Sequence, residues 1–226
     1  MNELQLLVEK KREALRQDIL AMGDLVSTAL RASLDALRGQ DLALAGQVIK
    51  SDDIINRARR TLEQEALVVL AAHQPAGRDL RLIGASLEMI AELERIADHA
   101  ADVGRILLRA EGQTFPADPV ERIAAMGEMA TAMFSDVMNA YARGADAEQA
   151  RDAVAREDEV DAQERETIQE LASWICGHPH NSMAGIELLW IAHHYERVAD
   201  RATNIAERII YIATGETPEL NGSDRD

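Results

Sequence analysis

Pairs of acidic or amide side chains separated by four residues occur at four places in the sequence. The pairs are Asp52 with Asn56, Glu94 with Asp98, Glu157 with Asp161, and Glu196 with Asp200. Residues four apart lie next to each other on one face of a helix, and like charges at that spacing repel by roughly 0.2–0.5 kcal/mol. Four such pairs therefore require compensating cations, either arginine side chains or bound metal ions.

Both kinds of cation are available to these pairs. Oxygens from two helices can hold a metal ion, as carboxylate-rich helical bundles hold iron or manganese. His193 favours a metal in the second half of the chain, because it precedes Glu196 by three residues and would lie beside Asp200 on a helix. The alternative is ion pairing with neighbouring arginines: Arg59, Arg81, Arg95 and Arg197. The sequence leaves both alternatives open.

The helix that carries Glu94 shows where its carboxylates lie. At about 100° per residue, Asp98 is about 40° and Asp102 about 80° from Glu94. They border an apolar stripe that holds one side of the helix: Ile83, Leu87, Ile90, Leu93, Ala97, Ala100, Val103 and Leu107. The carboxylates therefore line the edge of the core. We expect three polar residues to point outward: Glu92, His99 and His194.

The sequence around these pairs is duplicated. Residues 94–98, E-R-I-A-D, return as E-R-V-A-D at 196–200, and matches at similar offsets cover much of the chain. A breaker-rich stretch over 111–119 marks the junction. We therefore predict repeats over 1–113 and 114–215, followed by a polar tail over 216–226.

Each repeat divides into three long periodic segments. They predict helices over 3–38, 41–72, 78–111, 118–143, 146–177 and 182–215. Short connections make neighbouring helices antiparallel, so the predicted fold is all-α, with two tandem, pseudo-symmetric three-helix bundles. Asp41 and Asp146 are expected N-caps, and Gly39 and Gly144 are expected in left-handed C-terminal turns.

Composition restricts the functions that the chain can have. The formal net charge of −16 over 226 residues disfavours nucleic acid and anionic membrane surfaces as partners. No apolar run reaches the ~18 residues of a membrane-spanning helix, and the start does not resemble a signal peptide, so we expect a cytoplasmic protein without membrane insertion. The single cysteine, Cys176, is expected to be a small core residue beside Trp174.

No recognisable catalytic motif occurs in the sequence, which has no P-loop, dinucleotide-binding turn or nucleophile elbow. A carboxylate-bridged metalloenzyme remains an alternative, because carboxylate-rich bundles can activate oxygen. Such an enzyme should carry paired Glu-x-x-His motifs. The chain has one reversed motif, His193 to Glu196, and Ala91 stands where the first repeat would need a histidine. We therefore expect a binding protein and not an enzyme, with a purely structural scaffold as the other alternative.

The duplicated motif, the Gln74-Pro75 turn with 79–81, and the closing segment 209–215 strongly resemble the PhoU family of phosphate-uptake regulators over nearly the whole chain. The resemblance implies an adaptor that links the ATPase subunit of the phosphate ABC transporter to a sensor histidine kinase. It further implies a homodimer, E(D)-x-x-x-D motifs that can bind metal clusters, and repression of phosphate-starvation genes when phosphate is plentiful.

Transferred to this sequence, the metal motif has one set of residues in each repeat, on the middle and last helices. The first set is Asp52, Asn56, Glu94, Asp98 and Asp102, and the second is Glu157, Asp161, Glu196, Asp200 and Asn204. Hard oxygen ligands favour iron, manganese, magnesium or calcium. Asn56 and Asn204 are amides opposite acidic residues, so the two sites are expected to differ in occupancy or in metal.

Overall fold

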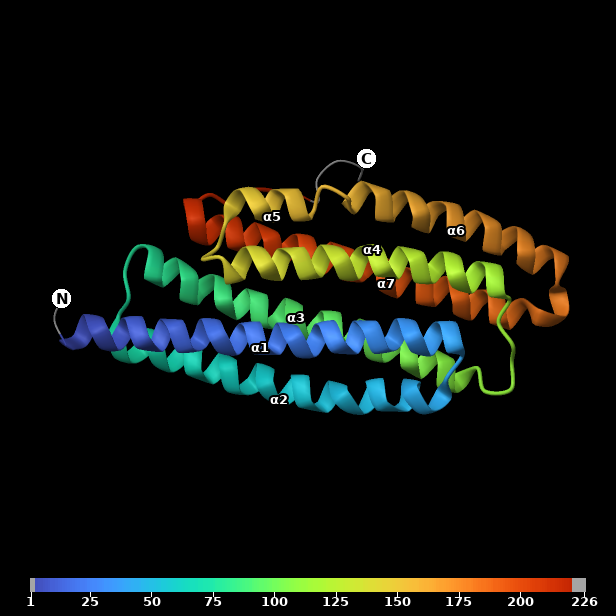
Figure 1. The fold of residues 1–226 in the computed structure, drawn as a ribbon, viewed down its shortest axis with the longest axis horizontal. Coiled ribbons are helices and arrows are strands. Elements are labelled where there is room, and N and C mark those ends of the chain that lie inside the picture. The colour runs from blue at the N-terminus through green and yellow to red at the C-terminus, as the bar shows by residue number, and fades with distance from the viewer. Residues whose placement is uncertain (1–2, 221–226) are drawn as a thin grey trace.

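The structure, a computed structural model, describes residues 3–220. All regular secondary structure within these residues is helical, and Figure 1 shows the helices as long rods lying nearly side by side. The elements are α1 (Glu3–Gly39), α2 (Leu42–His73), α3 (Arg78–Arg109), α4 (Ala117–Ala142), α5 (Ala147–Ala153), α6 (Glu157–Gly177), the 3-10 helix η1 (Pro179–Asn181) and α7 (Ser182–Thr214). The predicted polar tail over 216–226 lies partly outside the described residues.

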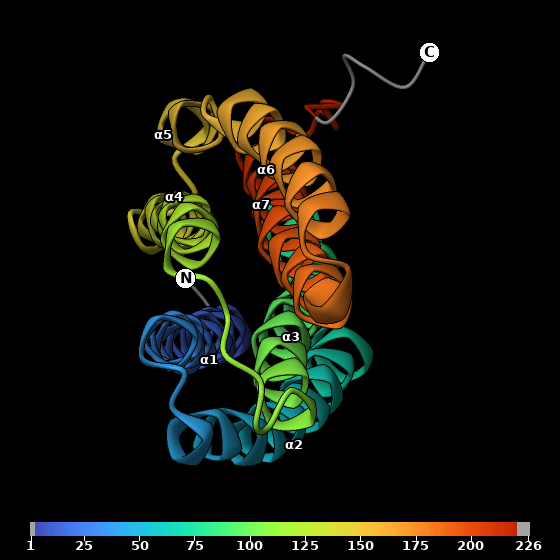
Figure 2. The same ribbon diagram turned by 90° about the vertical axis from the view of Figure 1, so that its right-hand side faces the viewer.

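The predicted fold class is confirmed. Helices α1 to α3 form one bundle, and α4 to α7 form the second, which lies beside the first (Figures 1 and 2). The prediction of one continuous helix over 146–177 was wrong, because α5 and α6 are separate. No glycine or proline marks this break. The chain turns there through hydrogen bonds three residues apart, which keep Ala153 and Val154 buried against the core.

Local capping and left-handed turns explain several of the helix boundaries. Asp41 caps α2 by accepting hydrogen bonds from two backbone N–H groups, and Asp146 caps α5 in the same way. Gly144 has a positive φ of 91°, as expected. The expectation for Gly39 was wrong, because Gly39 ends α1 in helical conformation and Gln40 takes the left-handed turn with φ 46°.

The two bundles share one hydrophobic core, because α1 and α3 pack directly against α4 and α7. Gly127 on α4 permits the close approach. A Cβ atom there would lie 2.6 Å from Leu34 Cδ2 on α1 and 2.9 Å from the Tyr195 ring on α7. The Tyr195 hydroxyl lies 3.0 Å from the buried Ser33 Oγ of α1. The bundles therefore meet over a closely packed interface.

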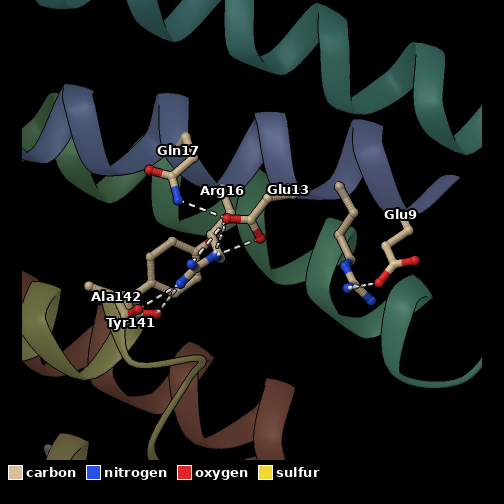
Figure 3. A network of polar contacts seen from close by, with 7 residues as sticks. Glu9, Glu13, Arg16, Gln17, Tyr141 and Ala142 are labelled. Carbon is tan, nitrogen blue, oxygen red and sulfur yellow. Dashed lines mark hydrogen bonds and ion pairs between the residues drawn. The ribbon is translucent and has the colours of Figure 1, made fainter. Parts of the chain in front are cut away.

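Polar contacts also connect the bundles at one end of α4 (Figure 3). Arg16 on α1 donates hydrogen bonds to the backbone carbonyls of Tyr141 (3.3 Å) and Ala142 (2.8 Å). Glu13 pairs with Arg16, and Gln17 donates to Glu13. Because the C-terminal end of a helix carries partial negative charge, the Arg16 guanidinium stabilises this end of α4.

Two further expectations concern α6 and membrane insertion. Cys176 is exposed on α6, so its prediction as a core residue was wrong. Helix α6 buries Val160, Thr167 and Leu171, and Cys176 lies away from that face. No helix among the described residues has the length and hydropathy needed to cross a membrane.

Candidate functional site

The first acidic cluster lies between α2 and α3 and contains arginine counter-ions. Arg59 on α2 donates a hydrogen bond of 2.6 Å to Glu94 Oε1 on α3. Asn56 donates to Asp52 Oδ2 at 3.0 Å, and Arg105 on α3 lies 3.7 Å from the same oxygen. Arginines from both helices thus offset part of the negative charge of this cluster.

The carboxyl groups of the first cluster raise one another's pKa values. Burial raises the pKa of Asp52, and the charge of Glu94 adds to that rise while Arg105 opposes it. Burial and then the charge of Asp52 raise the pKa of Asp98 to about 6. The structure therefore brings Asp52, Glu94 and Asp98 together. Asp52 Oδ1 is buried and accepts no hydrogen bond from the described residues.

The second acidic cluster lies between α6 and α7. His193 Nδ1 on α7 lies 3.2 Å from Glu164 Oε1 on α6 and 3.4 Å from Glu196 Oε2. Asp200 is buried and pairs with Arg197 at 2.6 Å. The sequence predicted His193 three residues before Glu196 and beside Asp200, and it missed Glu164. Its spacing of three residues after Asp161 is the signal that could have found it, since such residues share a helix face.

The second cluster binds protons more tightly than the first. Burial, followed by the charges of Asp200 and Glu164, raises the pKa of Glu196 to about 8. Burial and then Asp200 raise the pKa of Asp161. Glu196 Oε2 is buried and makes no hydrogen bond within the described part of the chain. The arrangement therefore favours a positive charge at Glu196, either a proton or a metal ion.

One pair of corresponding residues contributes to this difference, in addition to burial. Arg59 lies seven residues after Asp52, and Glu164 lies seven residues after Glu157, the counterpart of Asp52 in the second repeat. In the first cluster this position provides a guanidinium for Glu94, whereas in the second it adds a carboxylate near Glu196. Glu157 itself is the half-buried first residue of α6.

The three residues expected to point outward lie instead at the junction between α3 and α7. Glu92 is 9% exposed and lies 2.8 Å from Arg95, 3.4 Å from Arg201 and 3.3 Å from Asn204. His99 and His194 approach each other, with their Nδ1 atoms 3.1 Å apart. The outward assignment was wrong because the helix projection treated each repeat alone, and α3 buries a second face against α7.

Two predicted metal ligands also contact residues at this junction. Asp102 Oδ2 lies 3.9 Å from His194 Nδ1, while its Oδ1 accepts a hydrogen bond from Arg105. The Asn204 amide donates to Glu92. Burial lowers the pKa of His194, and burial with the charges of His194 and Arg201 lowers the pKa of His99 to about 4. Both imidazole rings are therefore neutral at pH 7.

Comparison with protein families identifies the family to which this chain belongs. The model of the PhoU domain matches residues 19–107 and 123–209, one match in each repeat. The chain belongs to the PhoU family. Two similar PhoU relatives are each named a phosphate-specific transport system accessory protein PhoU homolog. The one from Rhizobium meliloti (strain 1021) is 33% identical over 93% of this chain and 89% of its own length. The relative from Pseudomonas aeruginosa is 35% identical over 90% of this chain and 84% of its own length.

Solved PhoU structures have the same fold. The PhoU crystal structure from Pseudomonas aeruginosa superposes with a TM-score of 0.87 at 31% identity, covering 92% of this chain and 99% of that one. The crystal structure of the phosphate transport system regulatory protein PhoU from Streptococcus pneumoniae superposes with a TM-score of 0.86 at 27% identity. The match covers 94% of this chain and 100% of that one. Family membership thus confirms the resemblance of the sequence to PhoU and supports a regulatory role linked to phosphate transport.

Proposed function

We propose that the chain is a cytoplasmic adaptor that represses phosphate uptake and phosphate-starvation genes when phosphate is plentiful. Its proposed partners are the ATPase subunit of the phosphate ABC transporter and a sensor histidine kinase. The observation that carries this proposal is the PhoU match in both repeats, together with relatives named as accessory proteins of phosphate-specific transport. The role is regulatory and not catalytic.

The acidic clusters are the proposed working surfaces of the adaptor. Each bundle has one cluster along the seam between its middle and last helices, where partly exposed members such as Asp102 and Glu164 can attract basic residues of a partner. Electrostatic complementarity of this kind speeds association and selects partners. The net charge of −16 favours such basic partners over anionic ones.

We further propose that the second cluster binds a hard metal ion such as iron, manganese, magnesium or calcium. Glu196 Oε2 has no hydrogen-bond partner in the described residues, and Asp161 and Glu196 both have raised pKa values. These are the properties of carboxylates that lack a cation. The bound ion would supply positive charge, and Glu164, His193 and Glu196 would each offer it one ligand atom.

The first cluster fits a metal less well. Arg59 and Arg105 already lie against Glu94 and Asp52, and Asn56 contributes an uncharged amide. A metal bound by Asp52, Glu94 and Asp98 must therefore compete with two guanidinium groups.

We also propose a homodimer, which sedimentation velocity of the purified chain can test.

A phosphate-starvation reporter in a strain that lacks this gene and any second copy tests the regulatory role. Without the gene, the reporter should stay on in high phosphate, and the wild-type gene should switch it off. The double variant Glu94→Lys/Glu196→Lys should fail to restore repression, because it places one positive charge in each acidic cluster. The control is Glu65→Lys/Glu166→Lys, which changes exposed glutamates on the partner helices α2 and α6. Glu92 and His194 do not serve as controls, since they lie between the bundles.

Normal repression in the deletion strain would contradict the regulatory role itself. Repression by the Glu94→Lys/Glu196→Lys variant at wild-type protein levels would contradict only the role of the acidic clusters. Thermal unfolding of both double variants separates loss of function from loss of folding.

A further inference from the structure

The α3–α7 junction contains two polar clusters that occupy corresponding positions in the two repeats. At the offset of 102 residues, Glu92 corresponds to His194, His99 to Arg201, and Asp102 to Asn204. The Glu92 cluster consists of Glu92, Arg201 and Asn204. The histidine cluster consists of His194, His99 and Asp102. One pseudo-symmetric contact thus uses two different sets of chemical groups.

The cluster around Glu92 is complete by itself. Its carboxylate faces the guanidinium of Arg201 at 3.4 Å and the amide of Asn204 at 3.3 Å, so a negative charge meets two donors. The cluster around His194 places two imidazole nitrogens against each other beside a carboxylate oxygen. At 3.1 Å, one ring can donate a hydrogen bond to the other, or both Nδ1 lone pairs can bind one ion placed between them.

The separation of the two histidine nitrogens fits a tetrahedral metal ion, and a small movement would bring Asp102 to the same distance. Zinc binds histidine nitrogen at ~2.0–2.1 Å, and two ligands at the tetrahedral angle are then about 3.3 Å apart. The two Nδ1 atoms are 3.1 Å apart, and Asp102 Oδ2 is 3.9 Å from His194 Nδ1. One ligand atom from each of the three residues lies within 4.8 Å of the others.

The surroundings support the same assignment. Arg105 holds Asp102 Oδ1 at 2.6 Å, which leaves Oδ2 directed toward the histidines, and such outer contacts orient metal ligands. Asp102 is 39% exposed, so an ion and a fourth ligand, water, can reach the site from solvent. His194 is only 17% exposed, which fixes the position of its ring between the helices.

We propose that His99, Asp102 and His194 bind one divalent transition metal ion of the zinc class, which joins α3 of the first bundle to α7 of the second. This site differs from the acidic clusters, because two of its three ligands are imidazole nitrogens and its ligands come from both repeats. Binding would stabilise the arrangement of the two bundles, since an ion that binds only the folded protein raises its stability.

The test uses the full-length chain with any histidine tag removed and metals stripped by a chelator. Zinc titration by calorimetry should give one more equivalent for the wild type than for His194→Asn or His99→Asn. Cobalt should give the intense visible bands of a tetrahedral site in the wild type, and these variants should lose them. The control His180→Ala removes an exposed histidine outside the junction and should retain both signals.

A transplanted variant guards against loss of folding. The triple change His99→Arg/Asp102→Asn/His194→Glu copies the residues of the Glu92 cluster into the histidine cluster. It should fold, as judged by circular dichroism, and should lose the zinc equivalent and the zinc-induced rise in unfolding temperature. Unchanged zinc stoichiometry in this variant and in His194→Asn would overturn the proposal. It would leave the two histidines as a simple hydrogen-bonded pair.

Discussion

The acidic clusters of the two bundles have the same motif and different electrostatics. In the first, Arg59 reaches across from α2 and pairs with Glu94 at 2.6 Å. In the second, the corresponding residue on α6 is Glu164, and the pKa of Glu196 rises to about 8. A duplicated motif therefore does not ensure a duplicated site, because the partner helix decides whether the first glutamate of the motif pairs with an arginine.

The largest effect on stability is expected from Arg59→Glu, which makes the first cluster resemble the second. Glu94 is 12% exposed and Arg59 is 35% exposed, and removing the cation from this partly buried ion pair leaves an uncompensated carboxylate beside a new one. The metal-free protein should lose about 3 kcal/mol of unfolding free energy. Urea denaturation at pH 7.5 in the presence of a chelator measures this loss.

A change at a neighbouring position provides the control for this prediction. Arg60→Glu alters an exposed arginine on the same helix and should shift stability by less than about 0.5 kcal/mol. Equal effects of the two changes would show that net charge, and not the pairing with Glu94, determines stability.

The converse change, Glu164→Arg, should convert the second cluster into an ion-paired one. A guanidinium near Glu196 would compete with a bound metal, so manganese affinity at this cluster should fall about 100-fold, or about 2.7 kcal/mol. Calorimetric titration of the metal-stripped chain measures the change. Glu166→Arg, an exposed position on the same helix, should leave the affinity unchanged. An affinity within twofold of wild type for Glu164→Arg would rule out this cluster as the metal site.

The smallest effect concerns pH. In the metal-free protein, Glu196 keeps its proton in the folded state up to about pH 8, whereas an unfolded glutamate loses it near pH 4.3. Stability should therefore fall as pH rises between these values, because the folded state binds more protons than the unfolded state. Glu196→Gln should remove this fall and raise stability at pH 8.5 by about 2 kcal/mol relative to its effect at pH 4. Chemical denaturation across that range measures it.

Asp98→Asn offers the matched measurement in the first cluster. The pKa of Asp98 rises only to about 6, so the gain in unfolding free energy at pH 8.5 should be about half that of Glu196→Gln. This gain should reach its full size at a lower pH than for Glu196→Gln. A larger gain for Asp98→Asn than for Glu196→Gln would reverse the predicted order of the two clusters.

Much of the fold could be predicted from the sequence because helix formation and helix ends depend on nearby residues. The periodicity placed the long helices within a few residues of their observed bounds, and Asp41 and Asp146 acted as N-caps as expected. The break before Glu157 carried no glycine or proline and could not be foreseen, since it depends on packing of α5 against α4 and α7.

The candidate site also combines contacts that could be predicted from the sequence with contacts that could not. The resemblance to the PhoU family grouped Asp52 with Glu94 and Asp98, and the spacing of three residues grouped His193 with Glu196. The sequence did not show that Glu164 would face Glu196. The spacing of Glu164 three residues after Asp161 indicates the shared helix face, but the raised pKa of Glu196 depends on burial, which spacing does not give.

What only the tertiary structure decided is the junction between the bundles. A helix projection assigns one buried face, but α3 has two, one inside its own bundle and one against α7. Glu92, His99 and His194 were therefore assigned to the surface from the sequence, and the packing of the two repeats places them together. The sequence determined the helices, their order and the duplicated acidic motif, since these depend on local spacing. The environment of each charged group was decided by the packing, because desolvation and charge pairing depend on residues far apart in the chain.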